Sequence, residues 1–170
     1  MGKGFNCCNE IIEWIRENVP KGSTILELGS GRGSTQSLCH EYKMYSIEHD
    51  KKWLNRFDSS YIYAPIKDGF YDREVLKKEL PTEYELILVD GPPRKIDGKK
   101  IGRKGFGENL DLFNTDCIII FDDSDRGREK NLIASVCEQL GRSVTQYKGH
   151  DHRGKRTCFA VMGKEKKDGI

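Results

Sequence analysis

Short apolar runs alternate with amphipathic stretches along most of this chain. In the first amphipathic stretch, Ile11, Ile12, Ile15 and Val19 fall on one helical face, and Pro20 closes the helix. The apolar runs predict strands over residues 24–28, 44–47, 61–64, 85–89 and 117–121. This alternation is typical of a parallel sheet covered by helices.

The stretches between the strands predict further helices. Ser34 and Thr35 are expected to cap a helix over residues 34–42, and Asp50 a helix that buries Trp53 and Phe57. Two more helices are expected around 75–80 and 132–140, the second ended by glycine. Residues 91–107 hold five glycines and two prolines and predict a loop, followed by a weak helix over 108–114.

Two late apolar runs, 144–147 and 158–162, are separated by a polar turn and no helix. They predict an antiparallel hairpin at the end of the sheet. The expected fold is therefore a single-domain, Rossmann-like α/β fold with a seven-stranded, mostly parallel sheet and helices on both faces. The domain is expected to span residues 1–163, with a flexible tail over 164–170.

Composition excludes some classes of protein. Lysine and arginine total 29 against 27 acids, so the charge points to neither nucleic acid nor a membrane surface. No apolar run approaches the ~20 residues of a membrane span, and the first residues lack the apolar core of a secretory signal. The six cysteines form no Cys-x-x-Cys, which favours a reducing, cytoplasmic compartment without disulfides.

A glycine loop carries the most information. Glu27-Leu28-Gly29-Ser30-Gly31-Arg32-Gly33 follows a predicted strand and precedes a predicted helix. Such a loop lets a ligand lie against bare backbone, and the amides at the helix start attract a carboxylate or phosphate. Glu48 ends the next strand, where an acid can accept hydrogen bonds from ribose hydroxyls. The alternatives are a tight turn for the loop and a solvated strand end for Glu48.

The spacing Gly-x-Gly-x-Gly, with an acid two residues before it, resembles motif I of class I S-adenosylmethionine-dependent methyltransferases. Dinucleotide binders use Gly-x-Gly-x-x-Gly instead. The resemblance implies that the loop and Glu27 hold the methionine end, that Glu48 holds the ribose, and that residues 64–66 lie near the adenine. The cofactor-binding residues predicted are Glu27, Gly29, Ser30, Gly31, Gly33, Glu48, His49, Ala64, Pro65, Ile66 and Asp90.

Three aspartates follow strand ends: Asp90 after the fourth strand, and Asp122 and Asp123 after the fifth. Ligands of open α/β sheets bind at this edge. Clustered carboxylates repel, and a hard divalent cation or a shared proton relieves the repulsion. The three aspartates are therefore candidate metal ligands, with Asp90 and Asp122 also candidate catalytic residues. The alternatives are a turn former at Asp90 and helix caps at Asp122 and Asp123.

These acids resemble those of metal-dependent O-methyltransferases, which hold Mg²⁺ or a similar ion with an Asp and an Asp-Asn pair. Here the pair is Asp-Asp. A nearer local resemblance is to glucuronoxylan 4-O-methyltransferases and their relatives. The matching residues are Asp90-Gly91-Pro92, Arg103-x-Gly105, and Asp122-Asp123 with Arg126 and Glu129. The resemblance implies Mg²⁺ or Mn²⁺ as metal; without a metal, one aspartate acts as general base.

Basic residues gather in two loops, 94–104 and 148–156, the second including His150 and His152. The first lies where a substrate arrives, so we expect an anionic acceptor such as a uronic acid, a phosphosugar or a nucleic-acid backbone, with Arg103 holding its charge; mobile, solvated loops are the alternative. The predicted function is methyl transfer from S-adenosylmethionine, most simply to oxygen of a small or saccharide-like acceptor. An NAD-dependent oxidoreductase and a non-catalytic nucleotide-binding protein remain alternatives.

Overall fold

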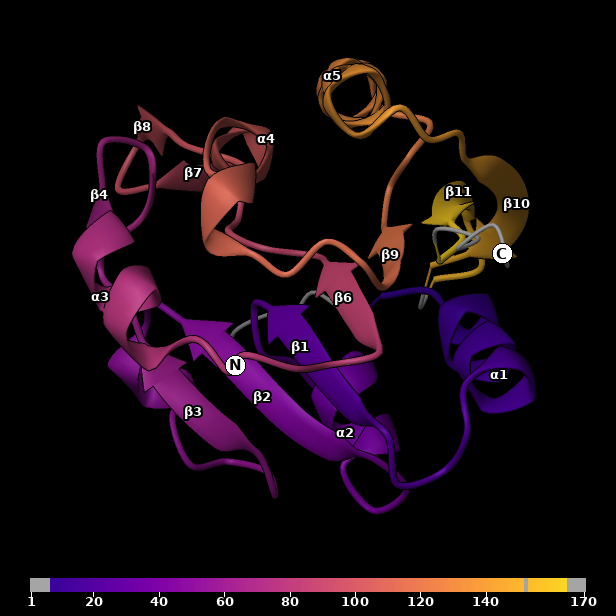
Figure 1. Cartoon of the computed structure of the whole chain (residues 1–170), viewed down its shortest axis with the longest axis horizontal. Helices are drawn as coiled ribbons and strands as arrows, with labels where there is room; N and C mark the ends of the chain where they lie inside the picture. The colour runs from indigo at the N-terminus through magenta and orange to yellow at the C-terminus, as the bar shows by residue number, and fades with distance from the viewer. Residues whose placement is uncertain (1–6, 152, 165–170) are drawn as a thin grey trace, which may run out of the picture.

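The computed structural model describes residues 7–151 and 153–164, and its centre is a seven-stranded sheet (Figure 1). The strand order is β10-β11-β9-β6-β1-β2-β3. The strands are β1 (Thr24–Leu28), β2 (Lys43–Glu48), β3 (Ser60–Tyr63), β6 (Leu86–Val89), β9 (Ile118–Phe121), β10 (Thr145–His150) and β11 (Arg156–Met162). The sequence prediction of a seven-stranded α/β sheet is confirmed.

Strand direction divides the sheet into two parts. Strands β3, β2, β1, β6 and β9 are parallel, so their carboxyl ends meet at one edge. Strand β11 runs antiparallel to β9, with Ala160 opposite Phe121, and β10 completes the predicted hairpin. The two late strands therefore extend the sheet beside β9 without adding to the parallel edge.

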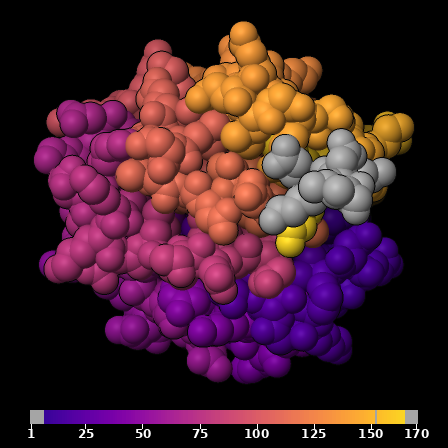
Figure 2. Space-filling view, viewed as in Figure 1, coloured from indigo at the N-terminus to yellow at the C-terminus, as the bar shows by residue number. Residues whose placement is uncertain are grey.

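Helices cover both faces of the sheet, as predicted (Figure 1). Helices α1 (Asn9–Asn18) and α2 (Ser34–Leu38) contribute Ile11, Ile15 and Leu38 to the core on one face. Helices α3 (Arg73–Glu79), α4 (Lys104–Glu108) and α5 (Gly127–Leu140) cover the other face. In the space-filling view, α4 and α5 lie side by side in the upper half (Figure 2).

Two helix predictions differ from the structure. The helix expected over 34–42 ends at Leu38, and Ser34 and Thr35 do not cap it, because both hydroxyls donate to Glu27. Asp50 does cap the next element, but that element is a single 3₁₀ turn, η1 (Lys51–Trp53). Trp53 and Phe57, expected to be buried, are only half-buried because no full helix carries them into the core.

The segment predicted as one loop over 91–107 contains structure of its own. It folds as the hairpin β7 (Lys95–Ile96) and β8 (Lys99–Lys100), followed by α4, and η2 (Leu110–Leu112) replaces the expected weak helix. A second short hairpin, β4 (Ile66–Lys67) and β5 (Phe70–Tyr71), was not predicted. Helix α4 packs directly on β5: a Cβ at Gly105 would lie 2.3 Å from the Phe70 side chain. Long-range packing therefore stabilises a helix with low intrinsic propensity.

Other sequence expectations meet the structure only in part. The tail over 164–170 lies outside the described residues except for Lys164, and His152 lies outside them too. All six cysteines carry free thiols, with Cys7 and Cys8 buried. Within residues 7–151 and 153–164, no helix is long and apolar enough to cross a membrane.

Candidate active site

The glycine loop lies at the carboxyl end of β1 and touches the loop that follows β6. Gly29 has a φ of +88°, a conformation that residues with a Cβ rarely adopt. A Cβ at Gly91 would lie 2.9 Å from the Gly29 Cα and 2.5 Å from the Tyr71 hydroxyl oxygen. Both positions therefore require glycine, because two backbone segments and a tyrosine converge there.

Glu27 is fully buried beneath this loop. Its carboxylate accepts hydrogen bonds from the hydroxyls of Ser34, Thr35 (2.6 Å) and Ser46 (2.9 Å). Burial raises the pKa of Glu27 to about 7, although the three hydroxyl donors lower it. The side chain thus fixes the start of α2 against β1 and β2 and places a titratable acid below the glycine loop.

Glu48 lies beside the same loop. Its Oε2 accepts a hydrogen bond from the Ser30 amide (3.1 Å), and its Oε1 accepts from the amides of His49 (2.7 Å) and Asp50 (2.8 Å). A carboxylate offers about four lone-pair positions. One lone-pair position on Oε2 therefore remains for a ligand hydroxyl. A second ligand hydroxyl can take the position that the Ser30 amide occupies.

The residues predicted near adenine, 64–66, start beside Glu48. The Ala64 amide donates to the Glu48 carbonyl oxygen (2.9 Å), and Ala64 is fully buried. Pro65 is exposed, while Ile66 begins β4 and is half-buried. These three residues therefore lead from the glycine-loop side of the site into the β4–β5 hairpin; their contact with a base stays a prediction.

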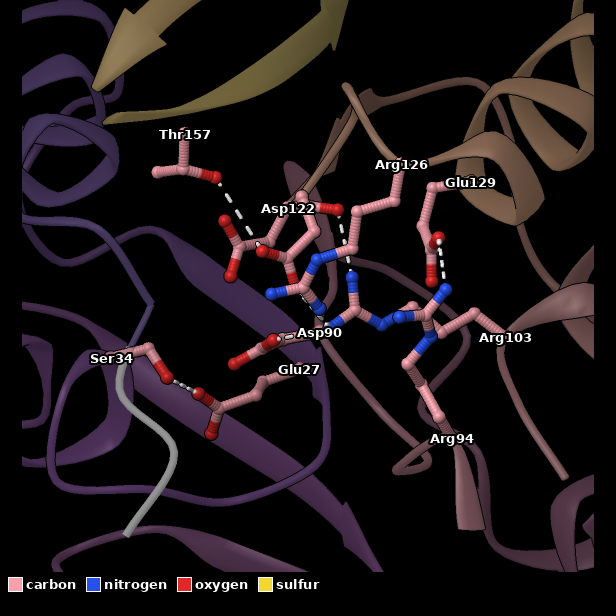
Figure 3. Close-up of polar contacts among 10 residues, drawn as sticks. Glu27, Ser34, Asp90, Arg94, Arg103, Asp122, Arg126, Glu129 and Thr157 are labelled. Atoms are coloured by element: carbon pink, nitrogen blue, oxygen red, sulfur yellow. Dashed lines mark hydrogen bonds and ion pairs between the residues drawn. The ribbon is translucent and has the colours of Figure 1, made fainter. Parts of the chain in front are cut away.

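The three aspartates converge as expected. One oxygen from each of Asp90, Asp122 and Asp123 lies within 4.8 Å of the others. Arg103 joins the group: its Nη2 donates to Asp90 Oδ1 (2.9 Å) and Asp123 Oδ2 (3.2 Å). Arg126 Nη1 lies 2.6 Å from the same Asp123 oxygen. Figure 3 shows these guanidinium groups directed at the carboxylates.

Helix capping does not explain these acids. Helix α5 begins after Arg126, and no side chain caps its first amides. Asp123 instead has a φ of +57°, and its Oδ1 accepts a 3.5 Å hydrogen bond from Thr157 of β11. The left-handed backbone turns Asp123 back toward the cluster, so the late hairpin also contributes to the site.

A divalent metal fits this arrangement poorly. The oxygen spacing suits a hard cation, but the Arg103 guanidinium already bridges two of the three donors and Arg126 neutralises one of them. An added ion would face two positive charges at close range. With both arginines in place, these residues therefore do not form a vacant metal centre.

Asp122 is the aspartate without a cationic partner. Its side chain is 5% exposed, and its Oδ1 has no hydrogen-bond partner. Burial and the adjacent Asp90 carboxylate raise the pKa of Asp122 well above its usual range, although Arg103 opposes the shift. Burial also raises the pKa of Asp90. Asp122 thus presents a free oxygen in a cluster otherwise held by arginines.

Sequence reasoning missed two neighbours of the site. Tyr71 of β5 is 1% exposed, and its hydroxyl has no hydrogen-bond partner. Burial, and then Glu48 and Asp90, raise the pKa of Tyr71. Burial, and then Asp90 and Asp122, likewise raise the pKa of Cys7, so its thiol is protonated. No motif marks either residue, because each reaches the site through tertiary packing.

No protein-family profile matches this sequence, and no curated protein sequence is significantly similar to it. Solved structures do share its fold. An O-methyltransferase from Bacillus cereus in complex with S-adenosylhomocysteine is 16% identical with a TM-score of 0.58, covering 92% of this chain and 80% of its own. A methyltransferase from Pyrococcus furiosus is 17% identical with a TM-score of 0.58, covering 90% and 80%.

A third similar structure is an O-methyltransferase from Streptomyces achromogenes involved in tomaymycin synthesis, in complex with S-adenosylmethionine. It is 13% identical with a TM-score of 0.56, and the match covers 92% of this chain and 78% of that one. The fold is therefore that of the S-adenosylmethionine-dependent methyltransferases, as the glycine-loop resemblance implied.

Proposed function

We propose that this protein is an S-adenosylmethionine-dependent methyltransferase that methylates a hydroxyl oxygen of a small or saccharide-like acceptor. The observation that supports the proposal most is the hydrogen bond from the Ser30 amide to Glu48, which joins the glycine loop to the acid after β2. The glycine loop that makes this contact has the Gly-x-Gly-x-Gly spacing, and the sheet beneath it ends in an antiparallel hairpin. That combination favours an adenosyl sulfonium over a dinucleotide.

The residues around the loop suit such a cofactor. Glu48 has acceptor capacity left for ribose hydroxyls. Glu27 places a buried acid toward the methionine end, where an ammonium group would stabilise its charged form. The unpartnered hydroxyl of Tyr71 lies between the two loops and can bond to the same ligand. When bound, S-adenosylmethionine supplies a methyl group activated by the positive sulfur.

The aspartate cluster serves the acceptor in this proposal. In its ionised form, Asp122 accepts the proton of the acceptor hydroxyl at its free Oδ1, and its raised pKa makes it a stronger base than an ordinary aspartate. Arg103 pairs with Asp90 and Asp123 and fixes their side chains, which leaves Asp122 as the carboxylate with an open oxygen. No metal is needed in this scheme, because Arg103 and Arg126 compensate the charges of Asp90 and Asp123. The free thiols agree with a reducing, cytoplasmic location, which we also propose.

Calorimetry tests the proposal directly. We expect S-adenosylhomocysteine to bind roughly tenfold or more tightly than NAD⁺. Preferential binding of NAD⁺ would support the oxidoreductase alternative instead. The non-catalytic alternative makes a different prediction. S-adenosylhomocysteine would bind wild type and Asp122→Asn equally well, and no acceptor in a broad panel of hydroxylated compounds would be methylated.

A further inference from the structure

A cavity of about 740 Å³ is lined by Arg103 and by no residue of the glycine loop. It runs between the β7–β8 hairpin, the β4–β5 turn and helices α4 and α5. Arg103 lines this cavity and also contacts Asp90 and Asp123. Arg103 is therefore the residue that the cavity and the aspartate cluster share.

Positive charge dominates the cavity wall. Five cationic side chains line it against three acids. The cations are Arg94, Lys100, Arg103, Lys104 and Arg128. Two of them have acidic partners within the wall, since Lys104 pairs with Glu108 and Arg94 lies 4.0 Å from Glu129. Arg103 is held by Asp90 and Asp123, so Lys100 and Arg128 are the cations left to attract an anion.

The β7–β8 hairpin adds a second sign of an anion site. Lys95 and Lys100 lie directly opposite each other in this antiparallel pair. Like charges in such a position destabilise a hairpin. An anion held at Lys100 would relieve that repulsion, so anion binding is expected to stabilise the hairpin.

Glu129 gives the cavity a built polar centre. Glu129 lines the wall yet is 4% exposed, and its Oε2 has no hydrogen-bond partner, since Arg94 Nη2 is 4.0 Å away. A buried carboxylate oxygen without a donor is costly. A ligand hydroxyl would supply the missing donor, and Figure 3 shows Glu129 beside the arginines, on the side of Arg103 away from Glu27.

We propose that this cavity is the acceptor site and that it binds a small hydroxylated anion, its phosphate or carboxylate held by Arg94 and Lys100 and a hydroxyl by Glu129. The inference rests on the proposed methyl transfer in calling the bound molecule the acceptor. The cations and the Glu129 oxygen that lacks a hydrogen-bond donor together select a polyol that carries an anionic group. A neutral sugar supplies a hydroxyl for Glu129 but no charge for the cations. Inorganic phosphate pairs with the cations but brings no sugar hydroxyl for Glu129.

Calorimetric titration of the full chain, saturated with S-adenosylhomocysteine, tests the site. Glucose 6-phosphate and gluconate are the phosphate and carboxylate probes, and glucose is the neutral control. We expect at least one of the anions to bind roughly tenfold more tightly than glucose, and the preferred arm identifies the anionic group. Equal binding of glucose and both anions would overturn the proposal, as would no binding at all. Tight binding of a short single-stranded oligonucleotide with neither probe bound would favour nucleic acid and overturn it too.

Two matched variants locate the contact. Lys100 lines the cavity while its neighbour Lys99 does not, so Lys100→Gln should weaken anion binding several-fold and Lys99→Gln should leave it within about twofold. Arg94→Gln should cost roughly tenfold. Equal losses in Lys99→Gln and Lys100→Gln would mean attraction by net charge alone and would contradict a defined site.

Glu129→Gln separates hydroxyl recognition from charge. The substitution removes a negative charge, so inorganic phosphate should bind equally or more tightly, whereas glucose 6-phosphate should lose several-fold in affinity. Parallel changes for both probes would contradict the role of Glu129. Binding of S-adenosylhomocysteine is measured first in each variant. If wild-type protein does not bind S-adenosylhomocysteine, the proposed function is wrong. If it binds S-adenosylhomocysteine but none of the anions, only the cavity proposal is wrong.

Discussion

Arg103 donates from Nη2 to Asp90 Oδ1 over 2.9 Å, and the two residues are thirteen positions apart in the chain. The same guanidinium donates from Nη1 to the Asp122 carbonyl oxygen over 2.7 Å. One arginine thus links the loops after β6 and β9, and its side chain is only 10% exposed. The position of this cation decides which aspartates are paired and which one keeps an oxygen open to a ligand.

Wild-type protein should not bind Mn²⁺ at the aspartate cluster, because Arg103 and Arg126 already occupy Asp90 and Asp123 and would repel the ion. Isothermal titration with Mn²⁺ measures this without reference to activity. The double substitution Arg103→Ala/Arg126→Ala removes both competing charges and should create measurable Mn²⁺ binding. Wild-type Mn²⁺ binding that disappears in Asp122→Asn would show that a metal enters despite the arginines.

Asp122→Asn should lower kcat by on the order of 10²-fold or more, because the amide cannot accept the acceptor's proton. The affinity for S-adenosylhomocysteine should change little, because Asp122 is proposed to act on the acceptor hydroxyl and not to hold the cofactor. Rates of methyl transfer and calorimetric affinities give the two readouts. An unchanged kcat would remove Asp122 as the base and leave Asp90 to be tested.

Glu48→Ala should weaken S-adenosylhomocysteine binding by roughly 1–3 kcal/mol if the ribose hydroxyls bond to this acid. The carboxylate also holds three backbone amides, so thermal unfolding must be measured alongside. Glu48→Gln is the conservative comparison, because it keeps one oxygen acceptor. Wild-type affinity in both variants would exclude the ribose contact.

Glu27 should make stability depend on pH. Its folded pKa, about 7, lies above its ordinary value of 4.5. The folded state therefore holds a proton more tightly than the unfolded chain, and this group destabilises the fold progressively as pH rises from about 4.5 to 7. Full ionisation costs about 3 kcal/mol by this linkage.

Urea denaturation of wild type and Glu27→Gln across that pH range isolates the effect. Glutamine does not ionise. The unfolding free energy of Glu27→Gln minus that of wild type should therefore rise by up to about 3 kcal/mol between pH 4.5 and 7. Above pH 7 the difference should stay constant. A difference that is flat across the range would mean that Glu27 keeps an ordinary pKa.

Gly91→Ala should destabilise the protein by about 1–3 kcal/mol, because the new methyl group collides with the Gly29 backbone and the Tyr71 hydroxyl. Gly127→Ala is the matched control: nothing lies within 4 Å of a Cβ there, and the residue begins α5. Thermal denaturation compares the two variants. Similar stabilities would show that the two loops can separate without cost.

The sequence by itself determined the sheet and its functional edge. Apolar runs such as residues 86–89 and 118–121 are buried on both faces, and a helix-covered parallel sheet satisfies that pattern. The chain direction then requires Gly29, Glu48, Asp90 and Asp122 to lie at one edge. Local patterns therefore sufficed to predict the fold class and the convergence of these residues.

Only the tertiary structure decided what surrounds them. Arg103 comes from a segment without periodicity, and its position depends on α4 packing against Phe70. Tyr71 beside Gly91, and Cys7 within the electrostatic influence of Asp90 and Asp122, are placed there by packing that no local pattern encodes. Charge balance and burial depend on distances between segments far apart in the chain. The choice between a metal and an arginine therefore followed from the packing, because sequence places the carboxylates but not the cation among them.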